Sequence, residues 1–203
     1  MNFDIESQRQ LIVEKKNNRE SFINEILQLP DFRSVAITAK LNLPSQSYGE
    51  VIQRWFKDKF GWDSISASDT SGDVKVFGYN VEVKASVSDD GRKYNYVQIR
   101  LTHDIDYYFL PTFNCVTDTG YLFLLDHSEM EDMVSNYGGY AHGCIKDNGA
   151  VRDNLSNPDG EFAIRPTFDA KGLGNKAWRS LLQYNKFSTE EEIYDRKIWE
   201  KSS

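Results

Sequence analysis

The segment SGDVKVFGYNVEVKAS, residues 71–86, is the most informative part of the sequence. Apolar and polar residues alternate through it, and the Gly78-Tyr79-Asn80 triplet in its middle has the composition of a tight turn. Alternation with a period of two is typical of half-buried strands. The segment therefore predicts a β-hairpin with strands at residues 73–77 and 80–86.

The second strand of this hairpin carries charges on one face only. Successive side chains of a strand point to opposite faces, so Glu82 and Lys84 share one face and the neighbouring valines share the other. Asp73 opens the preceding strand, and its carboxylate is expected to converge on Glu82. Two carboxylates offer the oxygen ligands that Mg²⁺ prefers, and a nearby lysine can hold a water or stabilise charge on a phosphate. The hairpin thus predicts a metal-assisted hydrolytic centre.

A simpler explanation of the same residues stays open, because an ordinary exposed hairpin with a cross-strand ion pair would also show them. An acid two positions before a lysine is common in this chain. The hairpin differs from the other cases in combining two strands, a tight turn and a second acid. The acid and lysine pairs are Glu14/Lys16, Asp73/Lys75, Glu82/Lys84, Asp169/Lys171 and Asp195/Lys197.

Three helical segments are expected before the hairpin. Residues 4–29 and 32–43 show helical spacing of apolar residues, and each segment is followed by a proline, which ends a helix. A third helix begins at Ser47, which stands three residues before Glu50 at the spacing of a capping box, and stops at Gly61.

The rest of the chain is predicted to mix short strands with helices. Strands are expected at residues 63–67, 94–101, 107–113, 121–125 and 161–166. Helices are expected at residues 128–136, 174–184 and 189–201. Residues 137–160 are rich in Gly, Asn and Asp and are expected to form the longest irregular region.

Composition favours one compact domain of a cytoplasmic protein. The chain has 203 residues, of which 39% are hydrophobic and 13% aromatic, enough for a sizeable core. No apolar run approaches the roughly 20 residues that span a bilayer, and the N-terminus lacks the apolar segment of a signal peptide. Cys115 and Cys144 stand far apart without companions at metal-ligand spacing, so both are expected to be reduced thiols.

The net charge of −7 is unevenly distributed. Between Arg100 and Lys146 there are seven acids and no Lys or Arg, so the remainder of the chain is balanced. A neutral remainder can still form a local basic groove for a polyanion. Acidity therefore argues against non-specific nucleic-acid binding more than against specific binding.

Asp73 followed by Glu82-Val83-Lys84 resembles the motif of the PD-(D/E)XK nuclease superfamily, whose core sheet carries such a hairpin. The resemblance implies that Asp73 and Glu82 bind the metal, that the Val83 carbonyl is a third ligand, and that Lys84 serves the nucleophilic water. The implied metal is Mg²⁺, for which Mn²⁺ can substitute. Gly72 stands where the family usually has a proline, a departure that the superfamily commonly tolerates.

Two further residues match the family by position, and each has an alternative explanation. Glu50, on the helix before the sheet, matches an additional acid often found there, although it could instead complete the capping box with Ser47. Gln98 stands where many members place a polar residue on the next strand, although it could be an ordinary solvent-facing strand residue. The resemblance covers residues 47–100, and its motifs are short.

Within that superfamily the chain is similar to small type II restriction endonucleases. The resemblance implies an α/β restriction-endonuclease-like core, with a mixed central sheet and helices on both sides. It also implies hydrolysis of double-stranded DNA by a homodimer without a nucleotide cofactor. We expect one domain, residues 1–203, with an N-terminal helical segment at 1–46, a catalytic core at 47–126, and a loop-rich recognition and helical part at 127–203.

The second half of the chain holds candidates for contacts to DNA. Residues 137–165 are expected to read base edges, because a long Gly- and Asn-rich segment is seldom a mere connection and its side chains can donate in the major groove. A flexible surface loop is the alternative. Candidate base contacts are His142, Lys146, Asn148, Arg152 and Arg165, with Asn154 beside them, and candidate phosphate contacts are Lys171, Lys176 and Arg179.

Two other functions stay open. Residues 35–57 could form a helix-turn-helix with Leu43-Pro44-Ser45-Gln46 as its turn, which would suit a non-catalytic DNA-binding regulator. A repair or junction-resolving nuclease could be built on the same core. Metal-dependent cleavage separates the regulator from the nucleases, and the shape of the preferred DNA separates the nucleases from one another.

Overall fold

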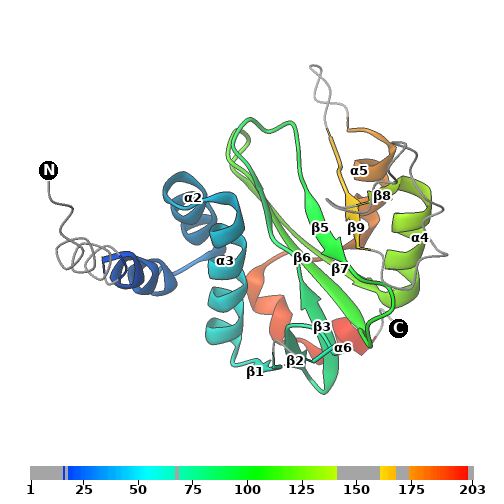
Figure 1. The fold of residues 1–203 in the computed structure, drawn as a ribbon, viewed down its shortest axis with the longest axis horizontal. Helices are drawn as coiled ribbons and strands as arrows, with labels where there is room; N and C mark the ends of the chain where they lie inside the picture. Colours follow the sequence, from blue (N-terminus) through cyan, green and yellow to red (C-terminus); the bar gives the residue numbers. More distant parts are fainter. Residues whose placement is uncertain (1–15, 17, 67–68, 141–160, 168–173, 201–203) are drawn as a thin grey trace, which may run out of the picture.

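A computed structural model describes residues 16, 18–66, 69–140, 161–167 and 174–200. Its centre is a mixed β-sheet with helices on both faces, which confirms the mixed α/β class (Figure 1). The sheet has the strand order β1-β2-β3-β6-β7-β10, and β4 extends it by pairing with β6. Its strands are β1 Asp63–Ser64, β2 Val74–Val76, β3 Tyr79–Val83, β4 Ser86–Ser88, β6 Tyr107–Asn114, β7 Thr119–Asp126 and β10 Asn185–Phe187.

A smaller sheet of three strands, in the order β5-β9-β8, lies beside α4 and α5 (Figure 1). Its strands are β5 Tyr96–Ile99, β8 Gly138–Tyr140 and β9 Phe162–Ile164. The helices are α2 Phe32–Asn42, α3 Ser45–Phe60, α4 His127–Tyr137, α5 Lys176–Leu181 and α6 Arg196–Glu200, with the 3-10 turns η1 Leu182–Tyr184 and η2 Glu190–Tyr194. Residues 18–27 are also helical. None of the helices among the described residues combines the length and the apolar character needed to cross a membrane.

The central strand β6 divides the core into two clusters because its side chains alternate between the faces. Tyr107 and Phe109 pack against α2, α3 and α6, whereas Tyr108 and Leu110 pack against α4, α5 and the small sheet. All eight residues of β6 are buried. A strand buried on both faces reads as a nearly continuous apolar run, which is why the sequence pattern located it closely.

Proline 111, inside the buried strand β6, marks a break in the neighbouring strand. Val83 of β3 lies opposite Phe109 of β6, and Ser86 of β4 lies opposite Thr112 of β6. The residues between, Lys84 and Ala85, therefore lie opposite the part of β6 that contains Pro111. Because proline has no N–H to donate, the ladder is interrupted there. The interruption between β3 and β4 therefore contains Lys84, the predicted catalytic lysine.

Several sequence predictions are wrong in detail. The hairpin turns at Phe77-Gly78, not at Gly78-Tyr79-Asn80, since Val76 pairs with Tyr79. Both turn residues have positive φ, 54° and 95°, as a two-residue type I′ turn requires.

The helix that was predicted from Ser47 begins earlier, at Ser45, and Pro44 is its N-cap. No side chain caps it, so the predicted capping box does not form. Residues 189–201 were predicted as one helix, but residues 190–194 form a 3-10 turn and only Arg196–Glu200 is α-helical. The short strands β4, β8 and β10 were not predicted, because three residues carry too little periodicity to be recognised.

Candidate active site

A cleft of about 700 Å³ opens where the N-terminal part of α3, the break between β3 and β4, and strand β5 meet. Four of the residues that the sequence nominated for catalysis line it, and they come from separate elements. We call this site the catalytic cleft. It is lined by Ser45, Tyr48, Gly49, Glu50, Gln53, Asp73, Val83, Lys84, Ala85, Asn95, Tyr96, Val97 and Gln98.

Asp73 is held against the end of β3 by two hydrogen bonds. Its backbone N–H donates to the Val81 carbonyl at 2.9 Å, and its Oδ2 accepts from the Val83 N–H at 2.9 Å. The Asp73 carboxylate is therefore held at the backbone of Val83, the residue after Glu82. Its other oxygen, Oδ1, accepts no hydrogen bond from a residue that the structure describes.

Gly72, directly before Asp73, has a conformation that only glycine adopts readily. Its φ is +91°, and an added Cβ would stand 2.8 Å from the Val81 carbonyl oxygen and 2.9 Å from Cδ1 of Ile105. Proline fixes φ near −65°. The family's usual proline is therefore incompatible with the backbone here, which gives a physical reason for its absence.

Glu82 and Lys84 form an ion pair at the inner end of the cleft. Lys84 Nζ lies 2.5 Å from Glu82 Oε1. Glu82 is buried, and burial raises the pKa of its carboxyl above the ordinary value. The Lys84 ammonium lowers that pKa, the like charge of Asp73 raises it further, and His103 lowers it more weakly. Burial is the largest of these influences, and the Lys84 ammonium offsets it only in part, so the pKa of Glu82 stays above its ordinary value.

The Val83 backbone also faces this centre. Lys84 N donates to the Phe109 carbonyl on the β6 side, whereas Val83 N donates to Asp73 on the opposite side. The N–H and C=O of one strand residue point to the same side, so the Val83 carbonyl is directed to the Asp73 side. Val83 lines the cleft, which agrees with the position expected of a third metal ligand.

The donor set fits a small, hard cation. Asp73 and Glu82 supply carboxylate oxygens and Val83 a carbonyl oxygen, and Mg²⁺ commonly keeps several waters beside one or two carboxylates. The two acids face one ammonium, so the cluster keeps a negative charge that a cation would neutralise. No group of three or more His, Cys, Asp or Glu suited to a metal occurs in the described part of the chain, so this centre is not a densely acidic one.

Glu50 and Gln98 both line the cleft, from α3 and β5 respectively. Since no capping box forms at the start of α3, the structural alternative for Glu50 is removed. Gln98 has φ +58°, and the pairing of β5 with β9 shifts register between Tyr96 and Ile99. A bulky residue with left-handed φ is uncommon and often belongs to a functional site. The Gln98 side chain is also exposed, as expected of the alternative, a solvent-facing strand residue.

The sequence did not nominate Tyr48, Gln53 or Asn95, which also line the cleft. Gln53 stands one helical turn after Glu50, so a helix carrying Glu50 could have suggested it. Asn95 is placed by a bond that no pattern reveals, from its backbone N–H to Ser86 Oγ at 2.9 Å.

The predicted DNA contacts lie outside the catalytic cleft or outside the described residues. Arg165 directly follows β9, and Lys176 and Arg179 lie on α5. All three are exposed, and none of them lines the cleft. Trp178, which separates two of these basic residues in sequence, is buried against Tyr94 rather than available to a base. His142, Lys146, Asn148, Arg152, Asn154 and Lys171 lie outside the described residues.

The two helices proposed as a helix-turn-helix exist, but they are part of the core. Only Leu43 and Pro44 separate α2 from α3. The apolar face of α3, including Trp55 and Phe56, packs into the cluster beneath the central sheet. Its N-terminal part lines the cleft.

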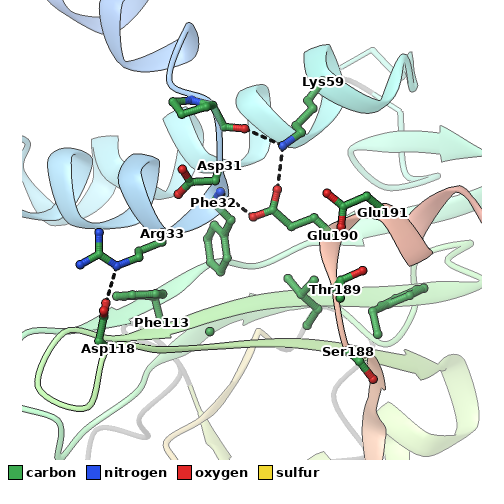
Figure 2. Close-up of a pocket in the computed structure, with 14 residues that line it drawn as sticks. Asp31, Phe32, Arg33, Lys59, Phe113, Asp118, Ser188, Thr189, Glu190 and Glu191 are labelled. Atoms are coloured by element: carbon green, nitrogen blue, oxygen red, sulfur yellow. Dashed lines mark hydrogen bonds and ion pairs between the residues drawn. The ribbon is translucent and has the colours of Figure 1, made fainter.

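A second cavity, of about 390 Å³, lies between the start of α2, the β6–β7 turn and the segment that enters η2 (Figure 2). Its charged groups bind one another. Glu190 accepts from Lys59 Nζ at 2.7 Å and from the Phe32 N–H at 2.6 Å, and Arg33 Nε lies 2.6 Å from Asp118 Oδ1. Lys59 also donates to the Pro30 carbonyl at 2.8 Å. We call it the second cavity, and these contacts tie the C-terminal segment to α2 and α3.

Comparison of the sequence with known proteins gives no match, either to a family model or to a curated protein.

Proposed function

We propose that the chain is a Mg²⁺-dependent, sequence-specific endonuclease of double-stranded DNA, of the type II restriction class. One observation supports this most strongly. Asp73 and Lys84 of the hairpin line a single cleft with Glu50 and Gln98, which the resemblance implies, and buried Glu82 is paired with Lys84. An ordinary exposed hairpin would not bury a carboxylate beside a second one.

The proposed reaction is hydrolysis of a phosphodiester. A water oxygen bonds to phosphorus while one ester P–O bond breaks, and the developing charge must be stabilised. Bound Mg²⁺ would supply a Lewis acid at this point. Asp73, Glu82 and the Val83 carbonyl would hold the cation.

Lys84 is the group placed to act on the reacting atoms. Its ammonium lies at the cleft and is already oriented by Glu82. It can donate to the attacking water or to a phosphate oxygen, and such a charge counts most where water is excluded. Lys84 would therefore stabilise the transition state more than the bound substrate.

Two further parts of the proposal rest on the resemblance. Cutting both strands of a duplex calls for two centres, so we propose that the chain acts as a homodimer. The exposed cations Arg165, Lys176 and Arg179 are proposed to contact DNA away from the centre, where they would contribute affinity that falls with salt.

The test is digestion of long phage DNA by the purified chain with Mg²⁺. Discrete bands are expected from wild type, and none from Asp73→Asn or in excess chelator. Branched and nicked DNA substrates are included so that a repair or junction-resolving activity would be recognised by its preference for shape. Absence of metal-dependent cleavage on all of these substrates would contradict the proposal.

A further inference from the structure

The catalytic cleft is lined by three carboxamides. Gln53 comes from α3, and Asn95 and Gln98 come from the segment around β5. Their side chains form no hydrogen bond with any other residue that the structure describes. A carboxamide carries two donor hydrogens and an acceptor oxygen, so the walls offer paired donors and acceptors to a ligand.

The fold fixes the β5 wall in place. Asn95 N donates to Ser86 Oγ at 2.9 Å, and the buried Tyr96 hydroxyl lies 2.5 Å from Thr112 Oγ1. These bonds tie the wall to β4 and β6, next to the break between β3 and β4 that contains Lys84. The left-handed φ of Gln98 is maintained although it is unfavourable for glutamine. The backbone that carries Asn95 and Gln98 is therefore fixed beside the proposed hydrolytic centre, and their exposed side chains are accessible to a ligand.

An aromatic ring completes the cleft. Tyr48 lines it, and Lys40 Nζ lies 5.2 Å from the centroid of the Tyr48 ring. Aromatic rings provide stacking surfaces for unpaired bases. Pockets of about 300–1,000 Å³ commonly hold ligands the size of a small molecule, and the cleft of about 700 Å³ lies in that range. A cleft of this volume has room for one planar base.

We infer that the catalytic cleft binds a single nucleobase that has left the stack, adenine in preference to the others, next to the cleaved phosphodiester. Only the position next to a cleaved phosphodiester rests on the proposed function. Asparagine and glutamine pair with the amino group and ring nitrogen of adenine. Adenine is also the base without a carbonyl oxygen. The carboxylates of Glu50 and Asp73, which line the same cleft, would repel the carbonyl oxygens of the other bases.

This inference changes where base recognition is expected. The sequence predicts that residues 137–165 read the bases, because a long Gly- and Asn-rich segment is seldom a mere connection. The structure places hydrogen-bonding side chains of α3 and β5 in the same cleft as that hairpin. A base rotated out of the duplex would bring its edge to them, at an unstacking cost of a few kcal/mol.

The experiment measures binding of free nucleosides to the full chain by saturation-transfer NMR, without added metal. A nucleoside has no phosphodiester, so the result does not depend on whether the chain cleaves DNA. Adenosine is expected to give clear saturation transfer to its base protons, and thymidine several-fold less. Loss of one paired carboxamide is expected to weaken adenosine binding about tenfold.

Gln98→Gly is the sharpest variant, because glycine accepts a positive φ without strain and only the side chain is lost. Tyr48→Ala removes the stacking surface, and Gln183→Ala, an exposed glutamine outside the cleft, is the matched control. Backbone amide spectra confirm that each variant is folded.

The inference is overturned if adenosine gives no transfer, or if Gln98→Gly and Tyr48→Ala bind it as well as Gln183→Ala does. Adenosine binding by a chain that cuts no DNA would leave the nucleobase site standing and remove the nuclease. Cleavage without adenosine binding would leave the proposed nuclease standing and remove the nucleobase site.

Discussion

The catalytic cleft and the second cavity differ in whether their polar side chains are bonded to other residues. In the second cavity, Glu190 binds both Lys59 and the backbone of α2, and Arg33 binds Asp118. At the catalytic cleft, Lys84 is paired with the buried Glu82, and the carboxamides of the cleft bind no described residue. The second cavity holds elements together, whereas the cleft keeps its polar groups available.

The number of acids in a cavity does not show how many of them are available to a ligand. The second cavity has more acids, namely Asp31, Asp118, Glu190 and Glu191, yet the first three already bind described groups. Acid content alone would favour the second cavity. Unmet hydrogen-bonding capacity, a buried charge and a strained backbone point to the cleft instead.

The largest expected effect is loss of cleavage when the cleft is altered. Asp73→Ala, Glu82→Gln and Lys84→Met should each lower the single-turnover rate with Mg²⁺ at least about 100-fold, because each removes a group that stabilises charge in the transition state. Glu190→Gln in the second cavity should leave the rate near that of wild type. Similar cleavage rates for the Asp73 and Glu190 variants would mean that the catalytic cleft is no more important for cleavage than the second cavity.

A backbone change at Gly72 should cost the most stability. Gly72→Ala introduces a Cβ that meets the Val81 carbonyl, and we expect a loss of about 1–3 kcal/mol or more in the free energy of unfolding. Gly78→Ala is the matched control, because Gly78 has a similar φ of +95° but open space around it. Urea denaturation compares the two, and an equal loss would mean that the close approach at Gly72 is unimportant.

Sequence patterns predicted the central strands well, because β6 and β7 are long and buried and the hairpin alternates cleanly. The pair of Glu82 and Lys84 on one face follows from a period of two, and the structure joins them directly. The cleft walls could not be predicted in the same way. Asn95 and Gln98 owe their positions to a backbone-to-serine bond and to a register shift, neither of which leaves a periodic trace.

The helix start at Ser45 shows a second limit. Ser47 and Glu50 have the spacing of a capping box, but Pro44 already sets the backbone at the helix entrance and α3 begins before Ser47. Ser47 Oγ instead accepts from Arg19 at 2.5 Å, a contact across 28 positions of sequence. A local motif was overridden by a partner that is distant in sequence.

Removing the central acid of the second cavity should give a smaller loss of stability. Glu190→Gln replaces a charge that accepts from Lys59 and from the start of α2, and we expect about 1–2 kcal/mol less free energy of unfolding. Glu25→Gln, at an exposed position of the N-terminal helical segment, is the control and should change little. If both variants unfold at the same urea concentration, the second cavity does not hold the C-terminal segment in place.

The smallest expected effect has the opposite sign. The pKa of Glu82 is raised in the folded chain, so its neutral form is favoured by folding, and stability falls as pH rises through that pKa. Glu82→Gln should therefore be slightly more stable than wild type at neutral pH without divalent metal, and the difference should disappear under acid. Thermal melts across this pH range measure it. A variant less stable than wild type at neutral pH would mean that the ion pair with Lys84 outweighs burial.

The central claim is that the catalytic cleft, and not the second cavity, binds a divalent cation through Asp73 and Glu82. Calorimetric titration of the full chain with Mn²⁺, which can replace Mg²⁺, tests it directly. The account predicts one cation per cleft for wild type and for Glu190→Gln, and loss of that binding in Asp73→Asn. Unchanged Mn²⁺ binding in Asp73→Asn, or its loss in Glu190→Gln, would contradict the account.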